Sequence, residues 1–108
     1  MKLYIGGAYQ GQLELARAEN PDALIFADFH ETVQKAMRRG EDARAFAQSV
    51  VAAHPDAVIV ANEVGAGVVP IKAQERAFRE AVGRALCVVA QAAQQVTRVV
   101  CGIGVRIK

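Results

Sequence analysis

The chain has 108 residues, of which 53% are hydrophobic and 22% are charged, and its 13 Lys and Arg residues nearly balance 11 Asp and Glu residues. This length and composition predict a single globular domain over residues 1–108. A net charge of +2 without a basic run lacks the electrostatic surface typical of nucleic-acid binding, and the apolar runs are too short to cross a bilayer. We therefore expect neither a nucleic acid nor a membrane as a partner.

The first residues and the cysteines indicate a cellular compartment. The chain reaches Gly6 before the apolar core of a signal peptide could form, so we expect a cytoplasmic protein in a reducing environment. Cys87 and Cys101 lie far apart, without a CxxC partner or histidines at ligand spacing. They are predicted to be free thiols buried as small apolar side chains, and we expect no metal site built by the protein alone.

Four β-like runs alternate with helical segments, at residues 2–5, 23–27, 57–61 and 98–102. This alternation predicts an α/β domain of three layers, with a mainly parallel sheet between helices. The second and third runs are continuously apolar, as expected for strands covered on both faces. They are predicted to form the centre of the sheet.

Helices are predicted over residues 12–19, 30–39, 41–53 and 73–95. The first stops before Pro21, because the residue preceding a proline is disfavoured in the helical region. The second stops at Gly40, a residue suited to the left-handed position after a helix. The last carries one apolar stripe at helical spacing, with charged residues outside it.

A glycine-rich loop joins the first strand to the first helix, which is the position of the phosphate-binding loop in the Walker A pattern GxxxxGK[ST]. Such a loop lets backbone N–H groups close on phosphates, and the helix that follows adds the positive end of its dipole. Gln12 and Leu13 stand where the pattern has lysine and Ser/Thr. The residues predicted to bind nucleotide phosphates are Gly6, Gly7, Ala8, Tyr9, Gln10, Gly11, Gln12 and Leu13. A glycine-rich turn without a ligand is the alternative interpretation.

Asp28 follows the second run, at the carboxyl edge of the sheet, where ligands of open α/β folds bind. A carboxylate in this place corresponds to the Walker B arrangement. The alternative is that Asp28 caps the helix that begins at His30.

The third run leads into a second candidate loop at the same edge. An Asn-Glu pair followed by two glycines and a proline is more typical of a binding loop than of a simple connection. The predicted ligand residues are Asn62, Glu63, Gly65, Gly67 and Pro70. We expect residues 62–70 to meet residues 6–12 at one edge of the sheet.

Two strings in the second half of the chain carry a family resemblance. Residues 58–70 read VIVANEVGAGVVP, and residues 76–84 read RAFREAVGR. They resemble the NEVGxGxVP…RxFRxxxGR pattern of the adenosylcobinamide kinase/adenosylcobinamide-phosphate guanylyltransferase family. The opening Gly-Gly-Ala of the first loop and the closing CGIG string are also similar to that family's ends.

The resemblance implies a P-loop NTPase-like fold and a role in cobalamin biosynthesis. It implies transfer of phosphate from ATP or GTP to adenosylcobinamide, with Mg²⁺ as a possible companion of the nucleotide, and then transfer of GMP through a guanylylated histidine. The expected partners are a nucleotide, possible corrinoid ligands and further copies of the chain in a homo-oligomer. The catalytic candidates are Asp28, Glu63, Arg76 and Arg79.

Two departures from the family pattern weigh against full activity. A neutral Gln12 removes a charge-assisted phosphate contact worth about 1.5–3 kcal/mol. The strand and helix that carry the acceptor histidine in the family are absent between residues 19 and 23. His30 and His54 do not match that position and are expected to be exposed or capping residues.

These departures leave two functional hypotheses open, beside the third alternative of an α/β domain that binds no ligand. The first is a short kinase-like phosphotransferase in which Lys72, Arg76 or Arg79 supplies the missing charge. The second is a non-catalytic nucleotide- or ligand-binding scaffold with the family fold. Both lack guanylyltransferase activity, because the segment that would carry the nucleophilic histidine is not present.

Overall fold

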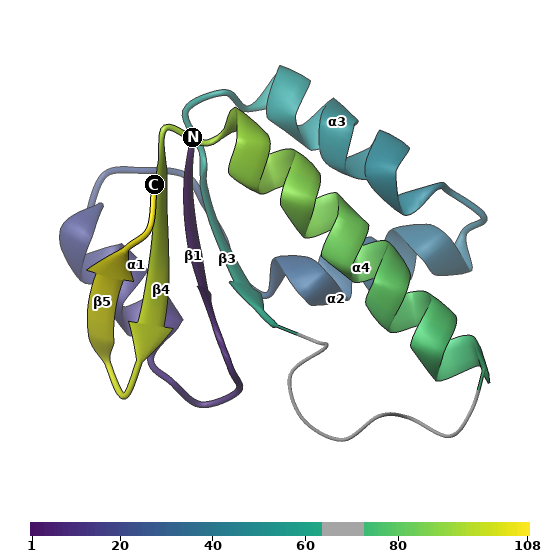
Figure 1. Ribbon diagram of the computed structural model, residues 1–108. Coiled ribbons are helices and arrows are strands. Elements are labelled where there is room, and N and C mark those ends of the chain that lie inside the picture. Colours follow the sequence, from purple (N-terminus) through teal and green to yellow (C-terminus); the bar gives the residue numbers. More distant parts are fainter. Residues whose placement is uncertain (64–72) are drawn as a thin grey trace.

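Strands and helices alternate along the chain in an α/β architecture (Figure 1). This computed structural model describes residues 1–63 and 73–108. The strands are β1 (Lys2–Gly6), β2 (Ile25–Phe26), β3 (Val58–Asn62), β4 (Gln95–Val100) and β5 (Ile103–Arg106). The helices are α1 (Gln12–Glu19), α2 (Phe29–Arg38), α3 (Ala43–Ala53) and α4 (Ala73–Ala92). The predicted fold class is confirmed.

The strands form one sheet in the order β2-β3-β1-β4-β5. β2, β3, β1 and β4 run parallel, and β5 pairs antiparallel with β4. The prediction that the second strand lies at the centre is wrong, because β2 is a two-residue edge strand and β1 is central. Ile25 and Phe26 do pack against cores on the two faces of the sheet. A continuously apolar run therefore indicates that helices cover both faces of a strand. It does not indicate whether the strand lies at the centre or at the edge of the sheet.

The end of the chain differs from the prediction in its boundaries. α4 ends at Ala92, three residues early, and the N–H of Gln94 donates to the carbonyl oxygen of Met1 at 2.9 Å, beside the start of β1. Val96 continues the apolar stripe of the helix, yet it is buried within β4. A turn with positive φ at Cys101 and Gly102 then leads into β5, a strand that was not predicted.

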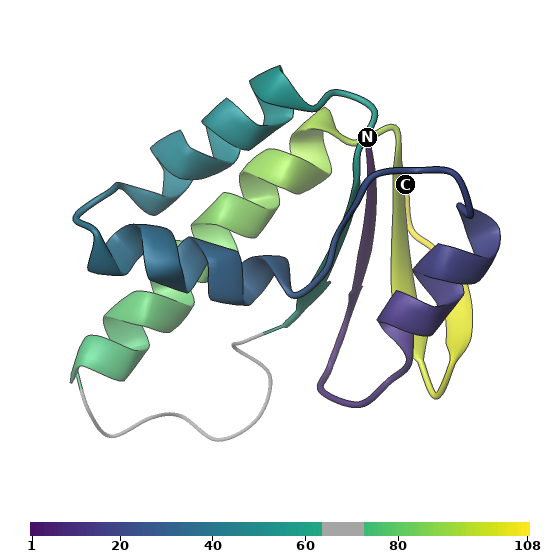
Figure 2. The same cartoon turned by 180° about the vertical axis from the view of Figure 1, so that it is seen from behind.

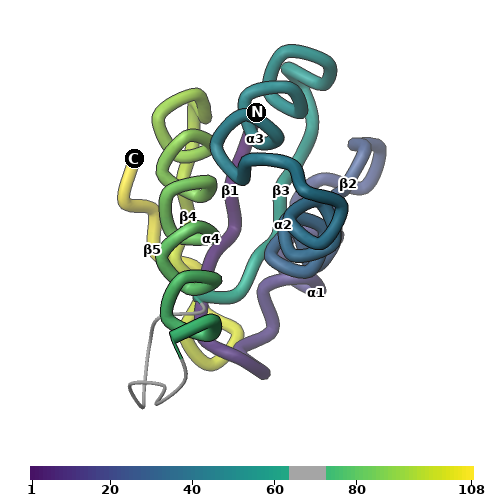
Figure 3. The backbone as a smooth tube through the Cα atoms, turned by 90° about the vertical axis from the view of Figure 1, so that its right-hand side faces the viewer, coloured from purple at the N-terminus to yellow at the C-terminus, as the bar shows by residue number. Residues whose placement is uncertain are grey.

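Helices cover the two faces of the sheet unequally. α1 lies alone on one face, and α2, α3 and α4 lie on the other, as the views from behind and from the side show (Figures 2 and 3). The core between α1 and the sheet contains Tyr4 and Ala16. The larger core on the other face of the sheet contains Leu3, Phe29 and Val82. The predicted three layers are therefore present.

Both cysteines are free and exposed, so the prediction that they are buried is wrong. Cys87 lies on α4 next to the buried Leu86, and Cys101 lies in the turn before β5. The residue type of a cysteine does not show whether its side chain faces the core or the solvent. Across the two described ranges, no helix combines the length and the apolar character that crossing a bilayer requires.

Candidate functional site

The predicted phosphate loop begins where β1 comes very close to β4. A Cβ placed on Gly6 would lie 2.5 Å from the carbonyl oxygen of Val99, a distance that real Cβ atoms essentially never show. Only glycine fits there without a backbone shift. The close contact fixes the direction in which the chain leaves the sheet and enters the loop.

The loop is also fastened to the turn between β4 and β5. The carbonyl oxygen of Gln10 accepts a hydrogen bond from the N–H of Gly102 at 2.7 Å, and Oε1 of Gln10 accepts one from the N–H of Cys101 at 2.7 Å. Gly11 then starts α1 in the left-handed conformation, with φ of 85°. These contacts hold a loop whose residues Ala8 and Tyr9 are exposed.

Several backbone N–H groups of this loop lack an acceptor within residues 1–63 and 73–108. Among the residues that the structure describes, no acceptor receives the N–H groups of Ala8, Tyr9, Gln10 or Gly11. They lie directly before the N-terminus of α1, whose dipole favours negative charge. This combination is the geometry with which backbone amides bind phosphate.

Gln12 is buried and ties the loop to β3. Its Nε2 lies 2.8 Å from Oδ1 of Asn62 and 3.1 Å from the carbonyl oxygen of Gly7. The carbonyl oxygens of Gly6 and Ala61 lie at 3.3 and 3.4 Å from the same atom. A side-chain amide has two N–H hydrogens, so these four acceptors leave none for a bound phosphate. The residue type of Gln12 indicates only a neutral replacement for lysine, so this internal role could not be predicted from the sequence.

The two candidate loops meet at the same edge of the sheet, as predicted, for the part that the structure describes. Gly6 pairs with Asn62 in the register of β1 and β3, and the N–H of Glu63 donates to the carbonyl oxygen of Gly6 at 2.8 Å. The remaining ligand candidates of the second loop, Gly65, Gly67 and Pro70, lie outside the described residues.

His30 is a part of this site that sequence reasoning missed. Its side chain is buried, and Nδ1 accepts a hydrogen bond from the N–H of Asn62 at 3.1 Å. The expectation of an exposed or capping residue is therefore wrong for His30, and its place two residues after Asp28 was the available signal. His54 is exposed and its ring lies 5.1 Å from that of Phe26, in the turn before β3.

Asp28 lies at the site without capping α2 through its side chain. Its backbone adopts the left-handed region with φ of 52°, and its carbonyl oxygen accepts the N–H of Glu31 at 2.9 Å. The carboxylate makes no capping hydrogen bond, so the capping alternative is wrong for the side chain. Asp28 instead lines a cavity with Gln12 and Asn62.

Two cavities open around the loop. The first, here called the loop cavity, has a volume of about 260 Å³ and is lined by Ala8, Tyr9, Gly11, Gln12, Leu13, Glu14, Asp28, Val60 and Asn62. The second, here called the junction cavity, has a volume of about 380 Å³ and is lined by Gly7, Ala8, Asn62, Glu63, Glu75, Phe78 and Arg79. The two cavities share Ala8 and Asn62 and gather most of the described site candidates, while Gly6, Gln10 and Arg76 line neither of them.

Among the described residues that line the two cavities, most charged side chains are negative. The loop cavity is lined by Glu14 and Asp28, and the junction cavity by Glu63 and Glu75, with Arg79 as the one cation among the described lining residues. Arg76 lies on the exposed side of α4. Within the described ranges, no three His, Cys, Asp or Glu side chains converge as metal ligands. An anionic ligand here needs a cation of its own or one from the protein.

Comparison with known proteins identifies similarity over most of the chain. A family model described as cobinamide kinase / cobinamide phosphate guanyltransferase matches residues 15–107. Two curated proteins, each called bifunctional adenosylcobalamin biosynthesis protein CobU, come from Escherichia coli K12 and Salmonella typhimurium LT2. Each is 51% identical over 51 residues, which is 47% of this chain and 28% of the relative. The chain thus matches under a third of each relative's length, and the family match begins after the glycine loop.

Proposed function

This chain belongs to the cobinamide kinase / cobinamide phosphate guanyltransferase family, and from that premise we propose that it acts in cobalamin biosynthesis as a nucleotide-binding protein. The phosphates of ATP or GTP bind the backbone N–H groups of residues 8–12, and a corrinoid is the second ligand. The protein works in the cytoplasm and as a homo-oligomer. It does not transfer GMP.

The observation that carries this proposal is the attachment of Gln12 to Asn62. A loop that served only as a turn would gain little from a buried amide shared among four acceptors. The amide keeps the loop against β3 while the N–H groups of Ala8, Tyr9, Gln10 and Gly11 stay without an acceptor in the described protein. A loop held in this way loses less conformational freedom when an anion binds than an untethered loop would, which favours binding.

The same arrangement supports slow phosphoryl transfer or none. The Gln12 amide carries no charge, and its hydrogens are already engaged. Loss of one preorganised donor to a transition state costs about 2.7–4 kcal/mol, and phosphoryl transfer depends mainly on such donors. Arg79 lines the junction cavity with Gly7 and Ala8, and it is a cation that could supply the missing charge. Lys72, which the sequence also offers as a source of this charge, lies outside the described residues.

Mg²⁺ fits this site only in company with a nucleotide. Magnesium is usually held by one or two carboxylates together with phosphate oxygens and water. Asp28 lines the loop cavity with a carboxylate that makes no capping hydrogen bond, so it is the residue that would share the ion. The negative side chains of Glu14 and Asp28 oppose a bare phosphate, and bound Mg²⁺ would neutralise part of that repulsion.

Guanylyl transfer requires a histidine nucleophile next to the nucleotide. Nδ1 of His30 accepts the N–H of Asn62 within the protein, and His54 packs against Phe26 before β3. His30 thus holds the end of β3 through its hydrogen bond with Asn62. His54 lies before the start of β3, at the end of the strand opposite the loop. These placements support a protein without guanylyltransferase activity.

Calorimetric titration with ATP, GTP and adenosylcobinamide, with and without Mg²⁺, tests the proposal. We expect nucleotide binding that Mg²⁺ strengthens and that Gly11→Ala weakens, because Gly11 has φ of 85° and lies in the loop. Gly40→Ala is the matched control, since Gly40 has φ of 86° and a Cβ added to it would meet no neighbour within 4 Å. Equal binding by both variants, or no binding of either nucleotide, would refute the phosphate loop.

A non-catalytic scaffold is the second candidate, favoured by the engaged amide of Gln12. The two candidates differ in turnover. Incubation with adenosylcobinamide and γ-labelled ATP or GTP yields labelled corrinoid if the protein is a kinase. Binding of the nucleotide without labelled product would assign the scaffold role.

A further inference from the structure

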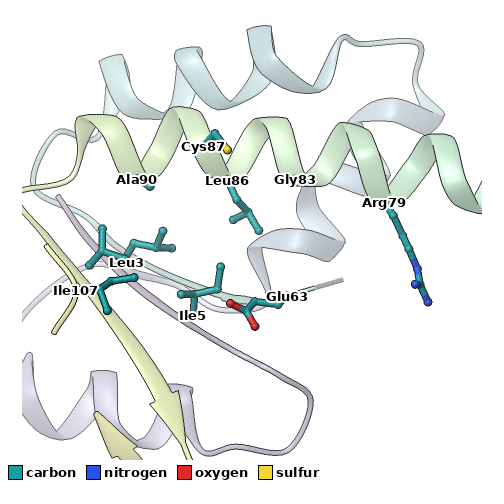
Figure 4. A pocket seen from close by; sticks show the side chains of 10 residues that line it. Leu3, Ile5, Glu63, Arg79, Gly83, Leu86, Cys87, Ala90 and Ile107 are labelled. Carbon is teal, nitrogen blue, oxygen red and sulfur yellow. The ribbon is translucent and has the colours of Figure 1, made fainter. Parts of the chain in front are cut away.

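A third hollow lies between α4 and the sheet, outside the two cavities around the loop (Figure 4). This apolar groove has a volume of about 450 Å³, within the range of small-molecule sites in proteins. Its apolar walls are formed by Leu3, Ile5, Leu86, Ala90, Val96 and Ile107. Glu63 and Arg79 provide its polar lining, and both residues also line the junction cavity.

Gly83 in the wall of the groove gives a second, independent observation. Glycine within a helix is less favourable than alanine, and Gly83 lies in the middle of α4. A Cβ on Gly83 would meet no atom of the described residues within 4 Å, so packing among those residues does not require the glycine. Its absent side chain widens the groove and lets a bound molecule reach the helix backbone.

We infer that the groove binds a small apolar molecule with a neutral hydroxyl head. The apolar body contacts Leu86 and Ile5, which face each other across the groove, and the head lies toward Glu63 and Arg79 (Figure 4). A hydroxyl can donate to a carboxylate and accept from a guanidinium, whose five N–H groups allow more than one contact. A carboxylate head would meet the like charge of Glu63, and an ammonium head that of Arg79.

This inference rests on the proposed function in one respect, the placement of the head. Because Glu63 and Arg79 line both hollows, a hydroxyl at that end lies beside Gly7 and Ala8 of the phosphate loop. The groove would thus open toward the proposed nucleotide site. Occupation of the groove itself does not require a nucleotide, so it can be measured separately.

Cys87 lines the groove and reports on its occupation. The chain has two cysteines, so Cys101→Ser leaves Cys87 as the single thiol, and its reaction with a chromogenic disulfide gives a rate. We expect saturating 1-octanol to slow this reaction several-fold without any nucleotide. Octanoate, with the same apolar body and a charged head, should protect less, and Glu63→Gln should narrow that difference.

Gly83→Leu supplies the decisive variant, because its side chain fills the groove. It should abolish the protection by 1-octanol, expressed as the ratio of rates with and without the alcohol, while Gly83→Ala keeps part of it. Thermal unfolding of both variants checks that each of them folds. Equal protection in Gly83→Leu, equal protection by octanoate, or no protection by 1-octanol would overturn the inference.

Two further results separate this inference from its alternatives. Protection that increases with protein concentration and not with 1-octanol would assign the groove to a second copy of the chain and overturn the inference. Protection by 1-octanol together with no nucleotide binding would refute the phosphate loop and leave the groove standing. Nucleotide binding without protection by 1-octanol would overturn the inference about the groove and leave the phosphate loop standing.

Discussion

Nε2 of Gln12, at the start of α1, lies 2.8 Å from Oδ1 of Asn62, at the end of β3. This hydrogen bond joins the two candidate loops, which are 50 residues apart in the sequence. It places a neutral, fully engaged amide where a P-loop kinase has a lysine that contacts phosphate. The replacement of that lysine by Gln12 removes a charged phosphate donor from the site, and substitutions at this position can test the consequence.

Replacing Gln12 and Leu13 by the residues of the Walker pattern should strengthen nucleotide binding. Gln12→Lys with Leu13→Ser supplies a charged phosphate donor and a hydroxyl, and it should improve the binding free energy by about 1.5–3 kcal/mol. Calorimetric titration with ATP and Mg²⁺ measures the change, and Leu13→Ser alone is the control. Unchanged affinity in the double variant would mean that the loop is only a turn.

The two ends of the Gln12 contact should differ in their effect on stability. Asn62→Ala removes one of four acceptors and should lower the free energy of unfolding by about 0.5–1.5 kcal/mol. Gln12→Leu removes the donor that all four acceptors share and should lower it by about 1–3 kcal/mol. Urea denaturation measures both values. A larger loss for Asn62→Ala would contradict the view that Gln12 is the centre of this contact.

His30 should matter for stability more than His54. His30→Phe leaves the part-buried N–H of Asn62 without its acceptor, and loss of such a hydrogen bond costs about 0.5–1.5 kcal/mol. His54→Phe, at an exposed turn, should change the free energy of unfolding by less than about 0.5 kcal/mol. Parallel chemical denaturation of both variants tests this, and equal effects would count against the structural role of His30.

Tyr4 should make stability depend on pH at the alkaline end. Burial, followed by the hydrogen bond to Glu19, raises the pKa of the Tyr4 phenol above its ordinary value of 10.0. The folded state therefore holds this proton more tightly than the unfolded state, so the stabilisation is fully present below pH 10 and is lost as pH rises through the folded pKa. Tyr4→Phe should flatten this part of the pH profile, and the exposed Tyr9→Phe should leave it unchanged.

Self-association should depend on the β4–β5 hairpin. Ile103 and Val105 are 68% and 54% exposed on an edge strand, and Val100 and Ile107 are exposed beside them. Apolar side chains in such a cluster mark contact surfaces. Light scattering at micromolar concentration should give a mass above that of the monomer, and Ile103→Lys should reduce it. A monomeric wild-type protein would exclude the homo-oligomer.

The sequence by itself determined the alternation of strands and helices, the family and the meeting of two loops at one edge. Each of these depends on local patterns: apolar runs, the glycines around Gly6, and the signature that begins at Asn62. Parallel strands place their carboxyl ends at the same edge whatever their order. The loops could therefore be brought together without knowing the neighbours of each strand.

Only the tertiary structure decided the strand order, the hairpin strand β5, the exposure of both cysteines and the burial of His30. The partners that fix these features are distant in sequence: β1 lies between β3 and β4, and His30 contacts Asn62 32 residues away. The role of Gln12 was also decided by distant partners. Its residue type indicated a missing charge, but its role depends on four acceptors that only the folded chain brings within 3.4 Å.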